Sequence, residues 1–171
     1  MRILKGRHAG RQLTSPGREV RPTPEHVRDR CLSLVEEELR GARVLDLFAG
    51  SGAMGLEALS RGARSVDFVE NGASALHSLK ANVAALHATK RSRIFKRDAL
   101  PWIQALEAGS YRLALVDPPY RSKKLDRVIE RWKAVPFADI LIVEHATDHE
   151  IAAKGKRYSF EGPTQVTILR A

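Results

Sequence analysis

Apolar and polar positions alternate along this chain in a rhythm typical of a parallel sheet covered by helices. Short apolar segments recur, and most are followed by a longer segment whose apolar side chains are spaced three and four residues apart. The first pattern is typical of buried strands and the second of amphipathic helices. Five strands are predicted in this part of the chain, at residues 43–48, 65–70, 93–96, 112–117 and 140–144.

Helices are predicted before and between these strands. Thr23 is expected to cap the first helix, with Pro24 at its first position and Gly41 after its end. Right-handed strand–helix–strand connections then place helices on both faces of the sheet. The later helices are predicted at residues 53–61, 73–86, 100–106 and 124–132.

The two ends of the chain depart from this rhythm. Residues 156–161 and 165–170 form two predicted strands with no helix between them, which indicates an antiparallel hairpin at one edge of the sheet. Residues 1–22 hold several breakers and can form a small β-hairpin. We therefore expect an α/β fold in residues 23–171, with a seven-stranded, mostly parallel, Rossmann-like sheet, and a basic hairpin extension in residues 1–22.

Composition narrows the class of protein. The 171 residues suit one domain, and no apolar run approaches the roughly 20 residues that cross a bilayer. The charged amino terminus does not resemble a secretion signal. Cys31 is the single cysteine, which excludes an internal disulfide framework, and the six histidines lack metal-ligand spacing, so no metal is expected. These features predict a cytoplasmic, monomeric protein without a membrane partner.

The charge of the chain predicts a polyanionic partner. Lysine and arginine total 29 against 20 acidic residues, a net charge of +9, which favours nucleic acid. The excess is concentrated near the amino terminus, with smaller clusters at residues 90–97 and 121–133. The candidate nucleic-acid contacts are Arg2, Lys5, Arg7, Arg11, Arg18 and Arg21.

A glycine-rich loop joins the first strand to the next helix. Its three glycines match G-x-G-x-x-G, which permits a tight turn and close approach of a ligand, although a turn that serves only helix packing gives the same glycines. The loop has no lysine, which excludes a P-loop, and the preceding carboxylate favours a cationic cofactor over the pyrophosphate of NAD. The candidate cofactor contacts here are Asp46, Phe48, Ala49, Gly50, Ser51 and Gly52.

Two further carboxylates follow the next two strands. Glu70 lies twenty residues after Gly50, where a carboxylate can accept hydrogen bonds from the ribose of either NAD or S-adenosylmethionine. Asp98, followed by Ala99, can accept from an adenine amine or cap the next helix, and both roles can hold at once. Ligands in such folds bind beyond the carboxyl ends of the strands, so these positions predict one site.

The tetrad Asp117-Pro118-Pro119-Tyr120 follows the fourth strand. The prolines stiffen the backbone and leave the Pro118 carbonyl free to accept, Asp117 supplies a second acceptor, and Tyr120 offers a face on which a base can stack. The exocyclic amine of a base is a poor nucleophile, because its lone pair is delocalised into the ring. Two acceptors can localise that lone pair and aim it at a methyl group, so the tetrad predicts amino methylation of a base.

These motifs together resemble the class I S-adenosylmethionine-dependent methyltransferases of the Asp/Asn-Pro-Pro-Tyr type. More narrowly the chain is similar to the RsmD family, which methylates the N2 amine of one guanine in 16S ribosomal RNA. The similarity extends over nearly the whole chain and is carried by residues 1–13, 20–24, 44–63, 68–70 and 116–120. It is loose from Lys154 onward, and Gly72 stands where a longer side chain is expected.

The resemblance implies roles for these motifs. Gly50 and Gly52 would pass near the methionine part of S-adenosylmethionine, Glu70 would hold the ribose, and Asp98 would meet the adenine. The tetrad would hold the target base as the catalytic residues. Further cofactor contacts are implied at Thr23, Asn71 and Ala99. The implied product is S-adenosylhomocysteine, and the implied partner is ribosomal RNA within a small-subunit assembly intermediate.

Three alternatives stay open at this point. The tetrad does not distinguish guanine from adenine, so an adenine-N6 or other amino methyltransferase on DNA or RNA fits, although about 22 additional residues are few for reading duplex sequence. A nicotinamide-dependent oxidoreductase explains the glycines and Glu70 but leaves the tetrad unused. A catalytically silent RNA-binding module explains only the charge.

Overall fold

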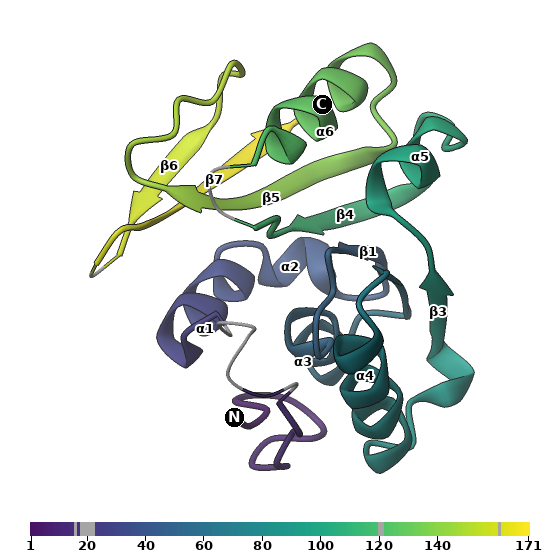
Figure 1. Cartoon of the computed structure of the whole chain (residues 1–171). Helices are drawn as coiled ribbons and strands as arrows, with labels where there is room; N and C mark the ends of the chain where they lie inside the picture. Colours follow the sequence, from purple (N-terminus) through teal and green to yellow (C-terminus); the bar gives the residue numbers. More distant parts are fainter. Residues whose placement is uncertain (16, 18–22, 120–121, 161) are drawn as a thin grey trace.

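Seven strands form a single sheet in the order β3-β2-β1-β4-β5-β7-β6 (Figure 1). The computed structural model describes residues 1–15, 17, 23–119, 122–160 and 162–171. Strands β1 to β5 pair in parallel, and β7 is antiparallel to both β5 and β6, which confirms the predicted sheet and its hairpin. The strands are β1 (Arg43–Leu47), β2 (Ser65–Glu70), β3 (Ser92–Lys96), β4 (Tyr111–Val116), β5 (Ala138–Ala146), β6 (Lys156–Ser159) and β7 (Thr164–Arg170).

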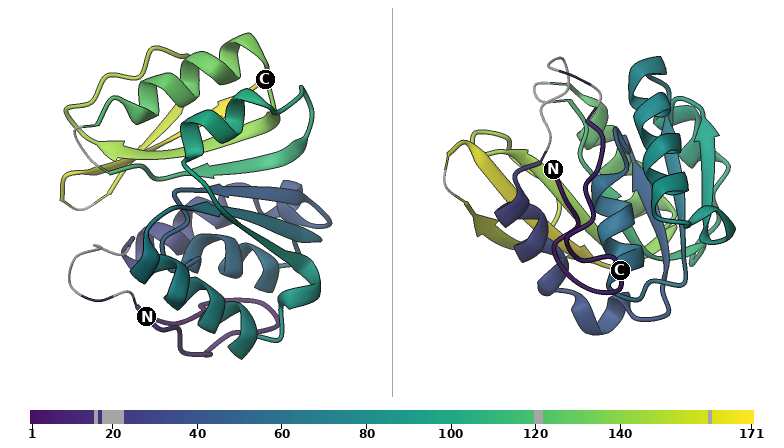
Figure 2. Two further views of the ribbon diagram at one scale, coloured as in Figure 1. Left: turned by 45° about the vertical axis from the view of Figure 1, so that its right-hand side comes forward. Right: turned by 90° about the horizontal axis from the view of Figure 1, so that it is seen from below.

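Helices cover both faces of this sheet, as predicted (Figure 2). Successive strand residues point to opposite faces: Leu113 and Leu115 of β4 join one core, and Ala114 and Val116 join the other. The first core also holds residues of α1 to α4, and the second holds residues of α5 and α6. The helices are α1 (Glu25–Ser33), α2 (Glu36–Leu39), α3 (Ala53–Ser60), α4 (Ala73–Ala85), α5 (Ala99–Gln104) and α6 (Lys124–Ala134), with a 3-10 turn η1 (Thr89–Arg91). None of the helices in the described ranges is long and apolar enough to cross a membrane.

The first helix differs from its prediction in two respects. The expected single helix up to Gly41 is broken between α1 and α2, because Val35 leaves helical geometry (φ −130°) while its side chain is fully buried. Tertiary packing overrides the helical periodicity there. The prediction that Thr23 is the N-cap is wrong: Pro24 occupies that position without a side-chain cap, and the Thr23 hydroxyl bonds elsewhere.

The amino-terminal segment forms a hairpin-like turn that packs into the first core. One antiparallel bridge joins Arg2 and Gln12, so the predicted hairpin is present without regular strands. Ile3 is fully buried and Leu13 is 6% exposed. Gly6 (φ 82°) lies so close to the end of α3 that a Cβ atom there would approach the Ser60 carbonyl oxygen to 1.9 Å. The described part of the extension therefore belongs to the body of the domain.

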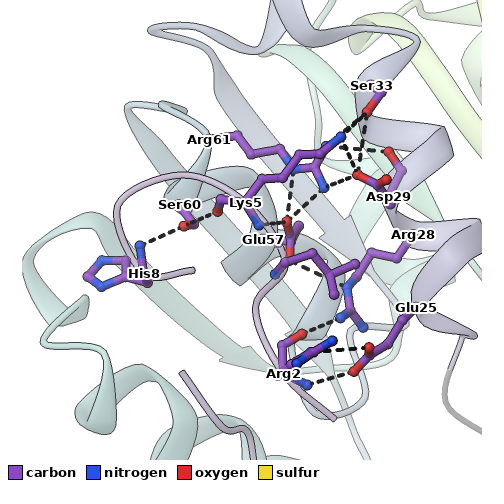
Figure 3. Close-up of polar contacts among 12 residues, drawn as sticks. Arg2, Lys5, His8, Glu25, Arg28, Asp29, Ser33, Glu57, Ser60 and Arg61 are labelled. Carbon is purple, nitrogen blue, oxygen red and sulfur yellow. Dashed lines mark hydrogen bonds and ion pairs between the residues drawn. The ribbon is translucent and has the colours of Figure 1, made fainter. Parts of the chain in front are cut away.

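A buried charge network ties this segment to α1 and α3 (Figure 3). The carboxylate of Glu57 accepts from the backbone amides of Leu4 (2.8 Å) and Lys5 (3.0 Å). It also pairs with Arg61 (2.8 Å) and Arg28 (3.6 Å), and all three charged side chains are almost fully buried. Removing one partner of such a network leaves a buried charge unpaired, which is strongly destabilising.

Candidate active site

Four carboxylates lie at the carboxyl ends of the neighbouring strands β2, β1, β4 and β5, on the face of the sheet that carries α1 and α3. Leu115 and Ile142 pack in the first core, and Asp117 and Glu144 lie two residues further along β4 and β5, so their side chains take the same face. In β1 and β2, Val44 and Phe68 also pack in the first core, so Asp46 and Glu70, two residues further on, take the same face. The four carboxylates are Asp46, Glu70, Asp117 and Glu144.

Asp46 binds the backbone of the glycine loop through a buried hydrogen bond. It is 4% exposed, and its Oδ2 accepts from the backbone amide of Gly55 at 3.0 Å. Burial raises the pKa of the Asp46 carboxyl well above its ordinary value, and the nearby charges of Asp117 and Glu70 raise it further. Gly55 is required for close packing, because a Cβ atom there would lie 2.5 Å from the ring of Phe68. Asp46 therefore positions the start of α3.

The other two glycines of the loop serve different purposes. Gly52 (φ 78°) is the N-cap of α3, and a Cβ atom there would lie 2.3 Å from Leu79 Cδ1, so it too serves packing. Gly50 (φ 56°) has no atom within 4 Å of the place where its Cβ would stand, apart from its chain neighbours. The open side of the loop is therefore at Gly50, where a ligand can approach the backbone.

Glu70 joins the end of β2 to the glycine loop. One carboxylate oxygen accepts from the amide of Gly50 at 2.8 Å, and the other accepts from Asn71 at 2.9 Å and Gly72 at 2.7 Å. A carboxylate can accept about four hydrogen bonds, so Glu70 can accept one more from a ligand in addition to these three. A Cβ atom at residue 72 would lie 3.1 Å from the Glu70 carboxylate, so a side chain there would require that carboxylate to shift slightly.

The remaining predicted cofactor residues lie at the start of the glycine loop or shortly after β3. Asp98 is exposed and caps α5 by accepting from the amide of Leu100 at 3.1 Å, as predicted, and Ala99 is buried. Phe48 has a positive φ of 62°, and its ring lies 5.7 Å from Lys124 Nζ. The Ala49 carbonyl accepts from the Gly52 amide at 2.7 Å inside the turn.

A buried asparagine that sequence reasoning missed supports the loop from α4. Asn82 Nδ2 donates to the carbonyl of Ser51 at 3.0 Å and to that of Thr14 at 2.9 Å. The Thr14 amide donates back to Asn82 Oδ1 at 2.7 Å. One side chain thus links the glycine loop to the amino-terminal segment. The signal available in the sequence was an asparagine next to the apolar positions of the predicted helix at residues 73–86.

Asp117 and Glu144 share a single hydroxyl group. Thr23 Oγ1 lies 3.1 Å from Asp117 Oδ2 and 3.1 Å from Glu144 Oε2, and its one proton serves one of them at a time. Burial and then the charge of Glu144 raise the pKa of Asp117 from 3.8 to about 8, although the Thr23 hydrogen bond opposes the shift. Glu144 was not predicted as a site residue, although it ends the predicted apolar strand at residues 140–144 just as Asp117 ends the one at residues 112–117.

Pro118 and Pro119 of the tetrad border a cleft of about 180 Å³. Pro118 is buried and Pro119 is exposed, and the Pro119 carbonyl accepts from Ser122 Oγ at 2.7 Å. His145 also lines this cleft, but its ring nitrogens are engaged at 2.9 Å by Thr167 Oγ1 and the Ala146 carbonyl. The predictions for Tyr120, Arg18 and Arg21 fall outside the described residues.

The described candidates for nucleic-acid contact divide into two groups. Arg2 pairs with Glu25 (3.6 Å) and Lys5 with Asp29 (2.8 Å), so part of their charge is neutralised within the molecule (Figure 3). The second group, Arg7 and Arg11, is exposed on the turn. Burial lowers the pKa of the nearby His8 imidazole, and the charges of Arg91, Arg7 and Arg11 lower it further, so basic side chains of the turn and of η1 lie near one another around His8.

Comparison with known proteins identifies the family. The model of the family described as conserved hypothetical protein 95 matches residues 1–160. The chain belongs to this family of RsmD-type methyltransferases. It is 33% identical over 158 residues to YlbH of Bacillus subtilis, which is provisionally named an rRNA methyltransferase. The aligned region covers 88% of this chain and 85% of YlbH. It is 36% identical over 132 residues to ribosomal RNA small subunit methyltransferase D of Escherichia coli K12, covering 75% and 65% respectively.

Solved structures agree with this RsmD-type assignment. The protein yhhF of Escherichia coli, provisionally named a methyltransferase, superposes with a TM-score of 0.84 at 29% identity, over 98% of this chain and 96% of that one. A hypothetical protein of Thermus thermophilus superposes with a TM-score of 0.83 at 28% identity, over 100% and 99%. The predicted Rossmann-like methyltransferase fold is thereby confirmed.

Proposed function

We propose that this chain transfers a methyl group from S-adenosylmethionine to the N2 amine of a guanine in 16S ribosomal RNA. The observation that carries the proposal is the position of Asp117 and Pro118 at the carboxyl end of β4, on the strand next to the glycine loop of β1. The names of the relatives YlbH and methyltransferase D support ribosomal RNA as the substrate.

The chemistry of the loop fits a cationic cofactor. Asp46, Glu70 and Asp117 are close enough for the charges of the latter two to raise the pKa of Asp46. A sulfonium or an ammonium bound here would offset the mutual repulsion of these carboxylates and favour their charged forms, whereas the pyrophosphate of NAD would add to that repulsion. Gly50 would then admit the methionine part, and Glu70 and Asp98 would meet the ribose and the adenine. This is the feature that favours a methyltransferase over a nicotinamide-dependent oxidoreductase.

The residues of the tetrad would position the amine and take its proton. When bound, S-adenosylmethionine supplies an electrophilic methyl carbon: the N2 lone pair forms the N–C bond, the S–C electron pair stays on sulfur, and one amine proton is released. Asp117 and the Pro118 carbonyl would accept the two amine hydrogens, and Tyr120 would stack against the base. Because the pKa of Asp117 is about 8, its carboxyl group can receive the released proton in the fraction of molecules where it is ionised, and this fraction grows as the pH rises through about 8.

The basic surface on the amino-terminal turn would bind the RNA backbone. The turn contacts Ser60 at the carboxyl end of α3, whereas the glycine loop precedes the amino end of that helix. Eight helical residues span about 12 Å, a distance that RNA flanking the target nucleotide bridges readily. We expect Arg7 and Arg11 to contribute most, since the charges of Arg2 and Lys5 are partly neutralised. An RNA-rich assembly intermediate in the cytoplasm would be the substrate.

Two experiments test this function. Isothermal titration with S-adenosylhomocysteine and with NAD separates the cofactor classes: we expect binding of the former alone, and binding of NAD alone would refute the proposal. Ribosomal RNA from a deletion strain should lack one N2-methylguanine, restored by the wild-type chain but not by Asp117→Ala. Asp139→Ala, at the opposite end of the sheet on β5, is the matched control and should restore it. A missing N6-methyladenine would establish the alternative instead.

A further inference from the structure

Glu144 is a buried carboxylate placed beside the proposed catalytic acceptor. It lies on β5, next to the end of β4, and is 8% exposed. Burying two carboxylates around one hydroxyl raises the free energy of the folded chain, because like charges repel and are poorly solvated. An arrangement of this kind at a ligand site indicates a functional demand for acceptors.

The chemistry of the bases specifies what such a second acceptor would recognise. In guanine two ring nitrogens flank the amine: N3 is an acceptor, but N1 carries a hydrogen, so the N1 side presents N–H donors at both N1 and N2. In adenine and cytosine the ring nitrogen beside the amine is an acceptor. A carboxylate next to the amine site would therefore attract guanine and repel the lone pair of the other two amino bases.

We propose that Glu144 accepts the N1–H of the target guanine while Asp117 accepts an N2–H, so that Glu144 determines the choice of base. The two carboxylate oxygens each lie 3.1 Å from Thr23 Oγ1, which brings them close enough to meet neighbouring N–H groups of one base. The Thr23 hydroxyl, which contacts both carboxylates, fixes the position of Asp117 relative to Glu144. This assignment rests on the proposed guanine-N2 methylation and adds its specificity determinant.

The test compares guanine with 2-aminopurine at the mapped target position of a ligated RNA. 2-Aminopurine keeps the N2 amine but has an acceptor at N1. The measured quantity is the ratio of kcat/KM for the two RNAs, from transfer of a radiolabelled methyl group. For the wild-type chain we expect guanine to be favoured about 10- to 100-fold, the range of one specific base contact. In Glu144→Gln the amide can donate to N1, so the ratio should fall about tenfold or more.

The controls separate recognition from folding. Glu130→Gln makes the same chemical change on the exposed side of α6 and should keep the wild-type ratio. 2-Aminopurine also lacks O6, but that difference from guanine is the same for the wild-type chain and for Glu144→Gln. The change in the kcat/KM ratio between these two proteins therefore reports on the contact with N1. A structural role for Glu144 would lower both rates equally.

The outcomes are distinguishable. A fall in the ratio for Glu144→Gln alone supports the assignment. An unchanged ratio in that variant overturns it, and so does a wild-type chain that methylates both RNAs equally, a result that needs no folded variant. A wild-type chain that leaves the guanine RNA unmethylated overturns the proposed function itself, together with this inference.

Discussion

Replacing Asp117 with asparagine tests the electrostatics of the site through the stability of the chain. In the folded state the pKa of Asp117 is raised from 3.8 to about 8, chiefly by burial and then by the charge of Glu144. The folded chain thus holds this proton more tightly than the unfolded chain does. The free energy of unfolding therefore falls as the pH rises from about 4 to about 8, and this contribution is constant above that range.

The size of the effect follows from the pKa difference. A difference of about four corresponds to ~6 kcal/mol as an upper limit, since each pKa unit is worth about 1.4 kcal/mol. Asp117 keeps some contact with solvent, which screens its charge, so we expect about 1 to 3 kcal/mol. Asparagine keeps an acceptor for Thr23 without a charge. The variant should therefore be more stable than the wild type by this amount at pH 8.5, and about equally stable near pH 4.

Urea unfolding followed by circular dichroism at several pH values between 4 and 9 measures this difference. Asp148→Asn is the matched control, because Asp148 is exposed and its replacement should leave the pH dependence unchanged. A stability difference between wild type and Asp117→Asn that does not vary with pH would refute the reasoning. So would a variant that is less stable than the wild type at pH 8.5.

Three further predictions concern activity, RNA binding and the buried network. The wild-type kcat/KM should rise with pH through about 8 as Asp117 loses its proton, and a pH–rate profile that is flat from pH 6 to 9 would contradict its role as an acceptor. Neutralising Arg7 and Arg11 to glutamine should weaken RNA binding and reduce the salt slope of log K by about 1 to 2, measured by fluorescence anisotropy; an unchanged slope would move the RNA site elsewhere. Glu57→Gln should lower the free energy of unfolding by about 3 to 5 kcal/mol, because it removes the buried partner of two arginines, and a loss below 1 kcal/mol in urea unfolding would show that those arginines find other partners.

Much of the fold was predictable because its signals are local. The apolar strands, the glycine loop and the closing hairpin each depend on residues close together in the sequence, and the observed sheet confirms them. The break between α1 and α2 was not predictable, because the burial of Val35 depends on what packs against it. The packing of the basic amino-terminal segment was not predictable either, because Ile3 and Leu13 are buried in a core with helices that follow much later in the sequence.

The sequence by itself determined which chemical groups follow each strand: the glycine loop, Glu70, Asp98 and the proline-rich tetrad. Only the tertiary structure decided which of these groups meet. Thr23 contacts Asp117 and Glu144 across 94 and 121 residues of chain, and it does so because β4 and β5 are neighbours in parallel register. The order of strands in a sheet is a property of the whole packed molecule, so the pairing of two carboxylates on one hydroxyl could not be found from any one segment.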